Sequence, residues 1–306
     1  MEQRSKMEYL LILLAVACFA AQFAFTKLYE GEAGQTATSS LVMLVGTSLV
    51  GALIFFCAGG FSVSFSPIST LWAAIFAVIM IPYYMIGIKV LSLGSLAVYS
   101  MFMMLGGMLV PFFYGIIFLE EKISLAQIAG TVLLTVFIVL QALCQKSSDE
   151  EAKGGNKYLF FILCIIIFFI NGMTGVVAKA HSVSAGAVDE MSFTATYCAM
   201  TSVLSLVILL ITLVRNRRGK LAVIKSAVNA KPILIMTLLG AAAYGGNFLQ
   251  LLAADKVPAS VQFPLVSGGV IVLSALVSLL FFKEKISKKE WISVAGAFVS
   301  TFLFSF

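Results

Sequence analysis

The chain has 306 residues, of which 61% are hydrophobic and only 11% are charged. A soluble globular domain carries about 25% charged residues, so this composition excludes a water-soluble globule and leaves most of the surface to lipid. The net charge of +6 does not indicate nucleic-acid binding, because the Lys and Arg residues of a multi-spanning protein gather in its cytoplasmic loops. The five cysteines lie far apart without a CxxC pair, which favours buried thiols over a zinc site or disulfides.

The first apolar run, 8–29, follows Arg4 and Lys6 and imitates a signal peptide, with AVAC at 15–18 resembling a lipoprotein cleavage site. A signal peptide releases a soluble product, whereas many further apolar runs follow here. We therefore expect this run to stay as the first membrane-spanning helix.

Ten runs in the sequence approach the roughly 20 apolar residues that a membrane-spanning helix needs. In chain order they are 8–29, 38–59, 68–91, 95–119, 124–145, 157–180, 190–214, 232–254, 258–282 and 287–306. Ten such helices leave short loops and no room for a soluble domain.

Two polar stretches divide these runs. KSSDEEAKGGNK at 146–157 is the most hydrophilic stretch of the chain and predicts a linker between a first half, 1–145, and a second half, 158–306. The longest loop, 215–231, is basic with apolar residues between its charges. That spacing favours a short amphipathic helix on the membrane surface, and a plain solvated loop is the alternative.

Motifs of the first half recur in the second half in the same order. The matching pairs are 119–124 with 282–287, 92–95 with 257–260, and Gln22…Lys27 with Asn171…Lys179. Three matches in one order indicate an internal duplication. Because each half has five helices, the second half must enter the membrane inverted. The sequence thus predicts an all-α integral membrane protein with ten transmembrane helices, built as two inverted five-helix repeats around a central site.

The chain resembles the EamA-like branch of the drug/metabolite transporter superfamily. The resemblance is carried by the EKIS ending after the fourth run (121–124) and the ninth run (284–287), and by the turn VPAS at 257–260. Gly130 falls where that family has a glycine in helix five, and the second copy has Ser293 there. The resemblance implies a bundle whose helices one, three, four, six, eight and nine surround a central cavity. Members of the family move metabolites, amino acids, nucleotide sugars or drugs, often outward.

Polar side chains inside the runs are the candidate substrate contacts, because they are costly in a bilayer unless they face a partner or a water-filled cavity. Asn171, flanked by glycines, serves either substrate binding or an interhelical hydrogen bond. Tyr99 and Gln262 lie early in runs that line the cavity in this family, or they anchor the interface. The candidates are Gln22, Thr26, Tyr83, Tyr99, Asn171, Lys179, Tyr244, Asn247, Gln250 and Gln262.

Charged residues stand near the ends of the runs. Lys27, Lys89 and Lys179 are expected to reach the headgroups. The alternative is attraction of an anionic substrate or charge exchange with a carboxylate, with Lys179 best placed. A structural role is favoured for Glu121 and Glu284, each beside a lysine. No run has an acidic residue near its centre, which disfavours a carboxylate proton relay. The glycine pairs at 106–107 and 268–269 favour close helix packing over a hinge.

These observations predict a secondary transporter in the inner or plasma membrane, an exporter or exchanger that moves a small metabolite or drug-like solute by alternating access. No HExxH, GxSxG or P-loop motif occurs, so we expect no enzyme activity, cofactor or metal, and the only histidine, His181, is expected to face solvent. The expected partners are a small solute and the lipid bilayer, with the chain a monomer or homodimer. A lipid-modifying membrane enzyme and a non-transporting assembly subunit are the alternatives. The substrate is not readable from the sequence, because phenylalanine is also ordinary lipid-facing filler.

The basic residues bear on the orientation of the chain. With ten spans, the side of the termini has Arg4, Lys6, Lys122, Lys179 and Lys256, and the opposite side has the other fifteen of the twenty. The positive-inside rule then places both termini outside the cytoplasm. The family resemblance implies the reverse, and we follow the charge count because the basic loop at 215–231 dominates it.

Overall fold

The computed structural model describes residues 2–34, 36–93, 96–145, 157–215, 217–254 and 256–281, and single residues or pairs between 291 and 303. Across these ranges the chain is helical and contains no strand. The helices are α1 Glu2–Ala33, α2 Ala37–Ala58, α3 Pro67–Leu93, α4 Leu96–Phe118, α5 Leu125–Gln145, α6 Lys157–Ser182, α7 Glu190–Arg215, α8 Arg217–Ala227, α9 Ala230–Ala254 and α10 Ala259–Phe281. The polar linker and most of the tenth predicted span, 287–306, lie outside the described residues.

Among the described residues, six helices contain a stretch long and apolar enough to cross a membrane. These stretches are Glu8–Ala33, Ala37–Ala58, Pro67–Gly87, Tyr158–Ser182, Glu190–Val214 and Ala230–Gln250. Shorter apolar helical stretches occur at Phe102–Phe118, Leu125–Leu140 and Ala259–Ser274. The chain is therefore an α-helical, multi-pass membrane protein.

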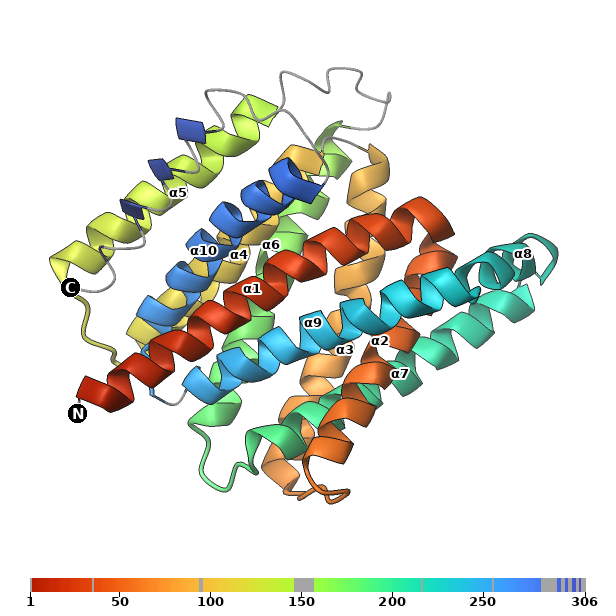
Figure 1. The fold of residues 1–306 in the computed structure, drawn as a ribbon, viewed down its shortest axis with the longest axis horizontal. Coiled ribbons are helices and arrows are strands. Elements are labelled where there is room, and N and C mark those ends of the chain that lie inside the picture. Colours follow the sequence, from red (N-terminus) through yellow and green to blue (C-terminus); the bar gives the residue numbers. More distant parts are fainter. Residues whose placement is uncertain are drawn as a thin grey trace.

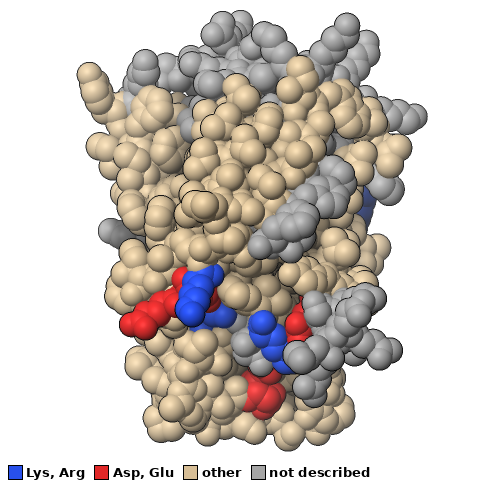
Figure 2. Space-filling view, turned by 90° about the vertical axis from the view of Figure 1, so that its left-hand side faces the viewer, with Lys and Arg blue, Asp and Glu red and all other residues tan. Residues whose placement is uncertain are grey.

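The outer surface of the bundle has the character expected against lipid. Large apolar side chains such as Leu13, Val203 and Ile211 point outward and are more than half exposed. On the face shown in Figure 2, most of the visible charged side chains gather in the lower part, and the described surface above them is largely uncharged. A largely uncharged surface with exposed apolar side chains is stable against lipid and not against water.

The loop at 215–231 forms a helix. α8 lies between α7 and α9, and its Ala227 is buried in a cluster with Tyr29 of α1 and Leu41 of α2. The prediction of a short helix in this loop is confirmed, and the plain-loop alternative is wrong. Packing of its apolar residues against α1 and α2 explains why the helix forms.

The helices of the two predicted halves are interleaved. α1 packs on α9 and α10, and α6 packs on α3 and α4. α2 packs on α7, and α4 packs on α10. Figure 1 shows α1 and α9 running side by side through the bundle. Among the described helices, every large interface except that between α4 and α5 therefore joins a helix before residue 146 to one after residue 156.

Glycines let the backbones approach where α4 crosses α6 and where α10 crosses α1. A Cβ on Gly106 would overlap the backbone carbonyl of Phe168, and one on Gly172 would overlap Val110. On α10, a Cβ on Gly269 would lie 2.9 Å from Val16 Cγ1. The close-packing interpretation of these two glycine pairs is thus confirmed at Gly106 and Gly269.

His181 is buried, and the expectation that it faces solvent is wrong. Its side chain is 1% exposed and stacks on Phe193, with ring centroids 3.7 Å apart. Its Nε2 lies 3.1 Å from Ser69 Oγ, which also accepts the backbone N–H of Val188 at 2.9 Å. The loop after α6 folds back over the helix end, which the sequence pattern did not indicate. His181 therefore links α3, α6 and the start of α7.

Candidate functional site

A cavity of about 210 Å³ lies inside the bundle and is walled by seven helices. The wall consists of Phe19, Gln22, Phe23, Phe76, Met80, Tyr83, Tyr84, Met103, Met104, Gly107, Asn171, Thr174, Gly175, Ala178, Phe193, Tyr197, Ala243, Tyr244, Asn247, Gln250, Gln262, Phe263, Val266, Ser267 and Val270. α1, α3, α4, α6, α9 and α10 supply most of it, and α7 adds Phe193 and Tyr197. These first six are the helices that the family resemblance implies, counted as spans one, three, four, six, eight and nine.

The cavity lies near the middle of the helices that wall it. Gly107 is central in α4, Asn171 is near the middle of α6, and Tyr244 is near the middle of α9. It is also bounded by two packed clusters, one containing Val16 and Val270, the other containing Phe76 and Tyr197. The packing on both sides holds the wall in place, because close-packed side chains resist displacement.

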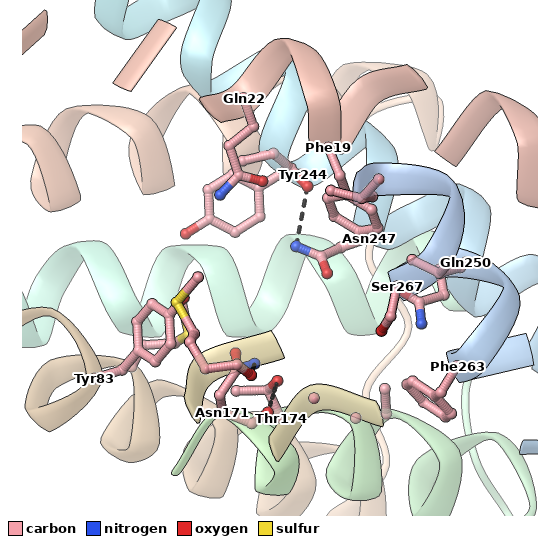
Figure 3. A pocket seen from close by; sticks show the side chains of 18 of the residues that line it. Phe19, Gln22, Tyr83, Asn171, Thr174, Tyr244, Asn247, Gln250, Phe263 and Ser267 are labelled. Atoms are coloured by element: carbon pink, nitrogen blue, oxygen red, sulfur yellow. Dashed lines mark hydrogen bonds between the residues drawn. The ribbon is translucent and has the colours of Figure 1, made fainter. Parts of the chain in front are cut away.

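Seven of the ten candidate residues line this cavity: Gln22, Tyr83, Asn171, Tyr244, Asn247, Gln250 and Gln262. Figure 3 shows Asn247 and Gln250 on one side of the space, with Asn171 and Thr174 on the opposite side. The structure thus brings together polar residues from α1, α3, α6, α9 and α10 that lie far apart in the sequence.

The other three candidates do not line the described cavity wall. Thr26 donates its hydroxyl to the backbone carbonyl of Gln22 at 2.9 Å, one turn earlier in α1. The side chain of Tyr99 lies outside the described residues. Lys179 is 5% exposed and points to a different set of partners at the end of α6.

Three amide side chains of the wall donate an N–H hydrogen bond to a backbone carbonyl. Asn171 Nδ2 donates to Met103 O of α4 at 2.6 Å, and Asn247 Nδ2 donates to Ala243 O at 3.0 Å. Gln262 Nε2 donates to Gln250 O across the α9–α10 interface. Asn171 therefore combines the two roles weighed for it, because it both bonds across the helix interface and lines the cavity.

The wall contains a buried hydrogen-bond acceptor that has no donor. Gln262 is fully buried, and its Oε1 has no hydrogen-bond partner among the residues that the structure describes. In α4, Pro111 has no N–H to offer the carbonyl of Gly107, four residues earlier. Unpaired buried acceptors are costly, so a donor that enters the cavity is stabilised there.

One cluster of aromatic rings lines the cavity from α3, α7 and α9. Phe76 and Tyr197 stack with their centroids 4.4 Å apart, and Tyr197 lies 6.0 Å from Tyr244. The hydroxyl of Tyr244 is 2.7 Å from Ser48 Oγ, which fixes the ring at its outer edge. Tyr244 is one of the candidates predicted from the sequence, whereas Phe76 and Tyr197 are not. Apolar and aromatic residues in a span give no signal that separates a cavity wall from lipid-facing filler.

Glu121 and Lys179 form a buried ion pair at one end of the bundle, where α10 begins. Lys179 Nζ lies 3.7 Å from Glu121 Oε1 and donates to Val257 O at 3.4 Å. The carboxylate also accepts the backbone N–H groups of Ala259 at 3.0 Å and Ser260 at 3.1 Å. These are the first N–H groups of α10, which have no partner within the helix and favour a negative charge.

This arrangement explains the two sequence motifs that carry the pair. The EKIS motif of the first half contacts the VPAS turn of the second half, so the motif joins the halves. The structure places Glu121 in the structural role favoured for it. Lys179 neither reaches the headgroups nor lines the cavity, because Glu121 and Val257 hold its ammonium group.

No family model and no curated protein matches the chain. Among solved structures, 28 chains match. One of them, a crystal structure, aligns with a TM-score of 0.74 over 97% of this chain and 96% of its own, at 15% sequence identity. A likeness at this identity shows that the fold is shared, and activity has to be argued from the site.

Proposed function

We propose that the chain is a secondary transporter of the drug/metabolite transporter kind, in the inner or plasma membrane, that moves a small solute by alternating access. The observation that carries the proposal is the cavity at mid-length of six helices, with five amide side chains in its wall. Polar groups at such a depth are stable only against a partner or in a water-filled space. Solute sites near the bilayer midplane, between two halves, are characteristic of secondary transporters.

The helix pairing supports inverted repeats as the basis of this mechanism. Exchanging the first half for the second turns α1 into α6, α3 into α9 and α4 into α10. The contacts of α1 with α9 and α10 then become those of α6 with α3 and α4, and both sets occur. α2 packs on its counterpart α7, and α4 on its counterpart α10, as an approximate two-fold axis requires. Two halves related in this way can rock about the cavity.

The contacts of Glu121 support a mechanism that closes one end of the cavity. They join the end of α4, the end of α6 and the start of α10. An alternating-access cycle has to separate elements at one end while those at the other end close. We propose that this set separates when its end of the cavity opens.

Alternating access is testable before any substrate is known. In a variant with all five cysteines replaced by alanine, we introduce Asn247→Cys at the cavity wall. We expect a small membrane-impermeant methanethiosulfonate reagent to modify this thiol from either side of proteoliposomes, because each side gains access in turn. The measurement is the fraction modified in right-side-out and inside-out vesicles.

The matched control is Ser205→Cys in α7, which is fully buried and lies away from the cavity, and it is expected to stay unmodified from both sides. Modification of Asn247→Cys from one side only, under all conditions, contradicts alternating access. No modification from either side contradicts it as well. Neither the lipid-enzyme nor the assembly-subunit alternative requires access from both sides.

We also propose that both termini lie outside the cytoplasm, with α8 on the cytoplasmic side. The basis is the charge count, since basic residues concentrate in the loop that contains α8. A reporter fused to the C-terminus that is active only in the cytoplasm is expected to stay inactive. An insertion of the same reporter between α8 and α9 is expected to be active. Activity of the C-terminal fusion overturns this orientation.

A further inference from the structure

We infer that the cavity binds an uncharged, planar aromatic solute that carries N–H or O–H donors on its edge. As a statement about what is transported, this inference rests on the proposed function. As a statement about binding, it rests on the cavity wall alone.

The aromatic part of the inference follows from the rings in the wall. Phe19, Phe76, Tyr83, Phe193, Tyr197 and Phe263 reach the cavity from α1, α3, α7 and α10. In Figure 3, Tyr83 and Phe263 lie at opposite ends of the space. Rings on several sides allow a flat ligand to make offset-stacked and edge-to-face contacts at once. Met80, Met103 and Met104 add side chains that adapt to the outline of a ligand.

The absence of charge from the described wall sets the charge of the ligand. None of the lining residues that the structure describes is Asp, Glu, Lys, Arg or His. The ion pair of Glu121 and Lys179 lies outside the wall and is satisfied by its own hydrogen bonds. A charged solute entering such a space loses its hydration without gaining a counter-ion, which is strongly unfavourable. A neutral solute has no such cost.

The donor requirement follows from the hydrogen bonds already made. Asn171, Asn247 and Gln262 each direct one amide N–H to a backbone carbonyl, so the amide oxygens of Asn171 and Asn247 point away from those carbonyls. The buried Oε1 of Gln262 has no hydrogen-bond partner among the described residues. This assignment is physically fixed, because exchanging oxygen and nitrogen would place two acceptors in contact. Gly107 also lines the cavity, and Pro111 has no N–H to donate to its carbonyl, which therefore lacks the usual donor four residues later. A ligand edge with N–H or O–H groups complements this set.

Four probes that share one ring separate these features. Benzamide is neutral and has two N–H donors, N,N-dimethylbenzamide is neutral without donors, benzoate is an anion, and benzamidinium is a cation. We expect the protein in lipid nanodiscs to bind benzamide, measured by calorimetry or equilibrium dialysis. We expect at least about tenfold weaker binding of the other three probes, a ratio equivalent to about 1.4 kcal/mol.

Variants at Asn247 test whether the preference comes from this cavity. Asn247→Leu removes the amide at similar volume and is expected to weaken benzamide about tenfold while leaving N,N-dimethylbenzamide unchanged. Asn247→Asp places a carboxylate in the wall and is expected to make benzamidinium the preferred probe. Thr237→Val, on the exposed face of the same helix, is the matched control and is expected to change none of the four affinities.

The results distinguish failure of this inference from failure of the proposed function. Tighter binding of benzoate or benzamidinium than of benzamide, or no binding of any probe, overturns the inferred ligand class. The inferred ligand class is also overturned if the Asn247→Leu variant binds benzamide with the same affinity as the unmodified protein. If benzamide binds as expected but Asn247→Cys is reached from one side only, the ligand class stands and the transport proposal falls. If Asn247→Cys is modified from both sides but the protein prefers benzoate or benzamidinium, the transport proposal stands and the ligand class falls.

Discussion

Replacing Glu121 by Ala is expected to lower the free energy of unfolding by about 3 to 5 kcal/mol, because it leaves the buried ammonium of Lys179 without its counter-ion. The 3.7 Å ion pair has side chains that are 6% and 12% exposed, so solvent does not replace the lost partner. The substitution also removes the acceptor for the first N–H groups of α10, whose loss adds about 0.5 to 2 kcal/mol. Unfolding in detergent, followed by far-UV circular dichroism during denaturant titration, measures the change.

The neighbouring carboxylate supplies the control for this prediction. Glu120 is exposed, so Glu120→Ala is expected to change the free energy of unfolding by no more than about 0.5 kcal/mol. Adding Lys179→Met to Glu121→Ala removes the unpaired charge and is expected to recover much of the lost stability. If Glu121→Ala and Glu120→Ala unfold alike, the ion pair does not hold the halves together. In the Asn247→Cys background, Glu121→Ala is further expected to raise modification from the side of this ion pair.

Gly106→Ala is expected to be the most damaging single-methyl substitution in the cavity wall's supporting helices. The new Cβ would overlap the backbone carbonyl of Phe168, so α4 and α6 have to move apart. Overpacking of this kind costs about 1 to 3 kcal/mol, and here the clash is with backbone that no rotamer change relieves. Separation of the helices also lengthens the 2.6 Å hydrogen bond from Asn171 to Met103 O. The same unfolding assay measures the stability, and benzamide binding reports on the cavity.

Gly245→Ala is the matched control in α9. Apart from its own turn of helix, no atom lies within 4 Å of the position that its Cβ would take, so the methyl group fits without displacement. Alanine in a helix interior is favoured over glycine by about 0.5 to 1 kcal/mol. We therefore expect Gly245→Ala to leave stability unchanged or raised. A loss for Gly106→Ala no larger than for Gly245→Ala contradicts backbone contact at the α4–α6 crossing.

The sequence by itself determined the class of the protein and the positions of most helices. Sparse charge and long apolar runs require lipid around the chain, since these properties are set by composition and do not depend on how helices pack. The nine predicted spans from 8–29 to 258–282 each correspond to an apolar helix of the structure. α8 was also predictable from the sequence, because its charged and apolar residues alternate over a helical period. The inverted repeat and the family remain predictions.

The polar residues of the candidate site were partly predictable from the sequence for a related reason. An amide in an apolar span needs a partner or a cavity, so Asn171, Asn247, Gln250 and Gln22 stood out against their surroundings. Phe76 and Tyr197 did not, because an aromatic ring is equally stable against lipid and against a cavity. Only the packing of α3 against α7 places these two rings at the cavity.

Tertiary structure alone decided which charged and polar groups serve as structural contacts. Lys179 and Glu121 are 58 positions apart, and neither sequence neighbourhood indicates that they meet the first turn of α10. His181 was predicted to lie at the start of a loop, but the structure buries it against Phe193. Local sequence sets whether a segment forms a helix in lipid, since the backbone has to be satisfied within the segment. The partner of a side chain depends on which helices cross, and that is fixed by close packing at residues such as Gly106 and Gly172 across the whole bundle.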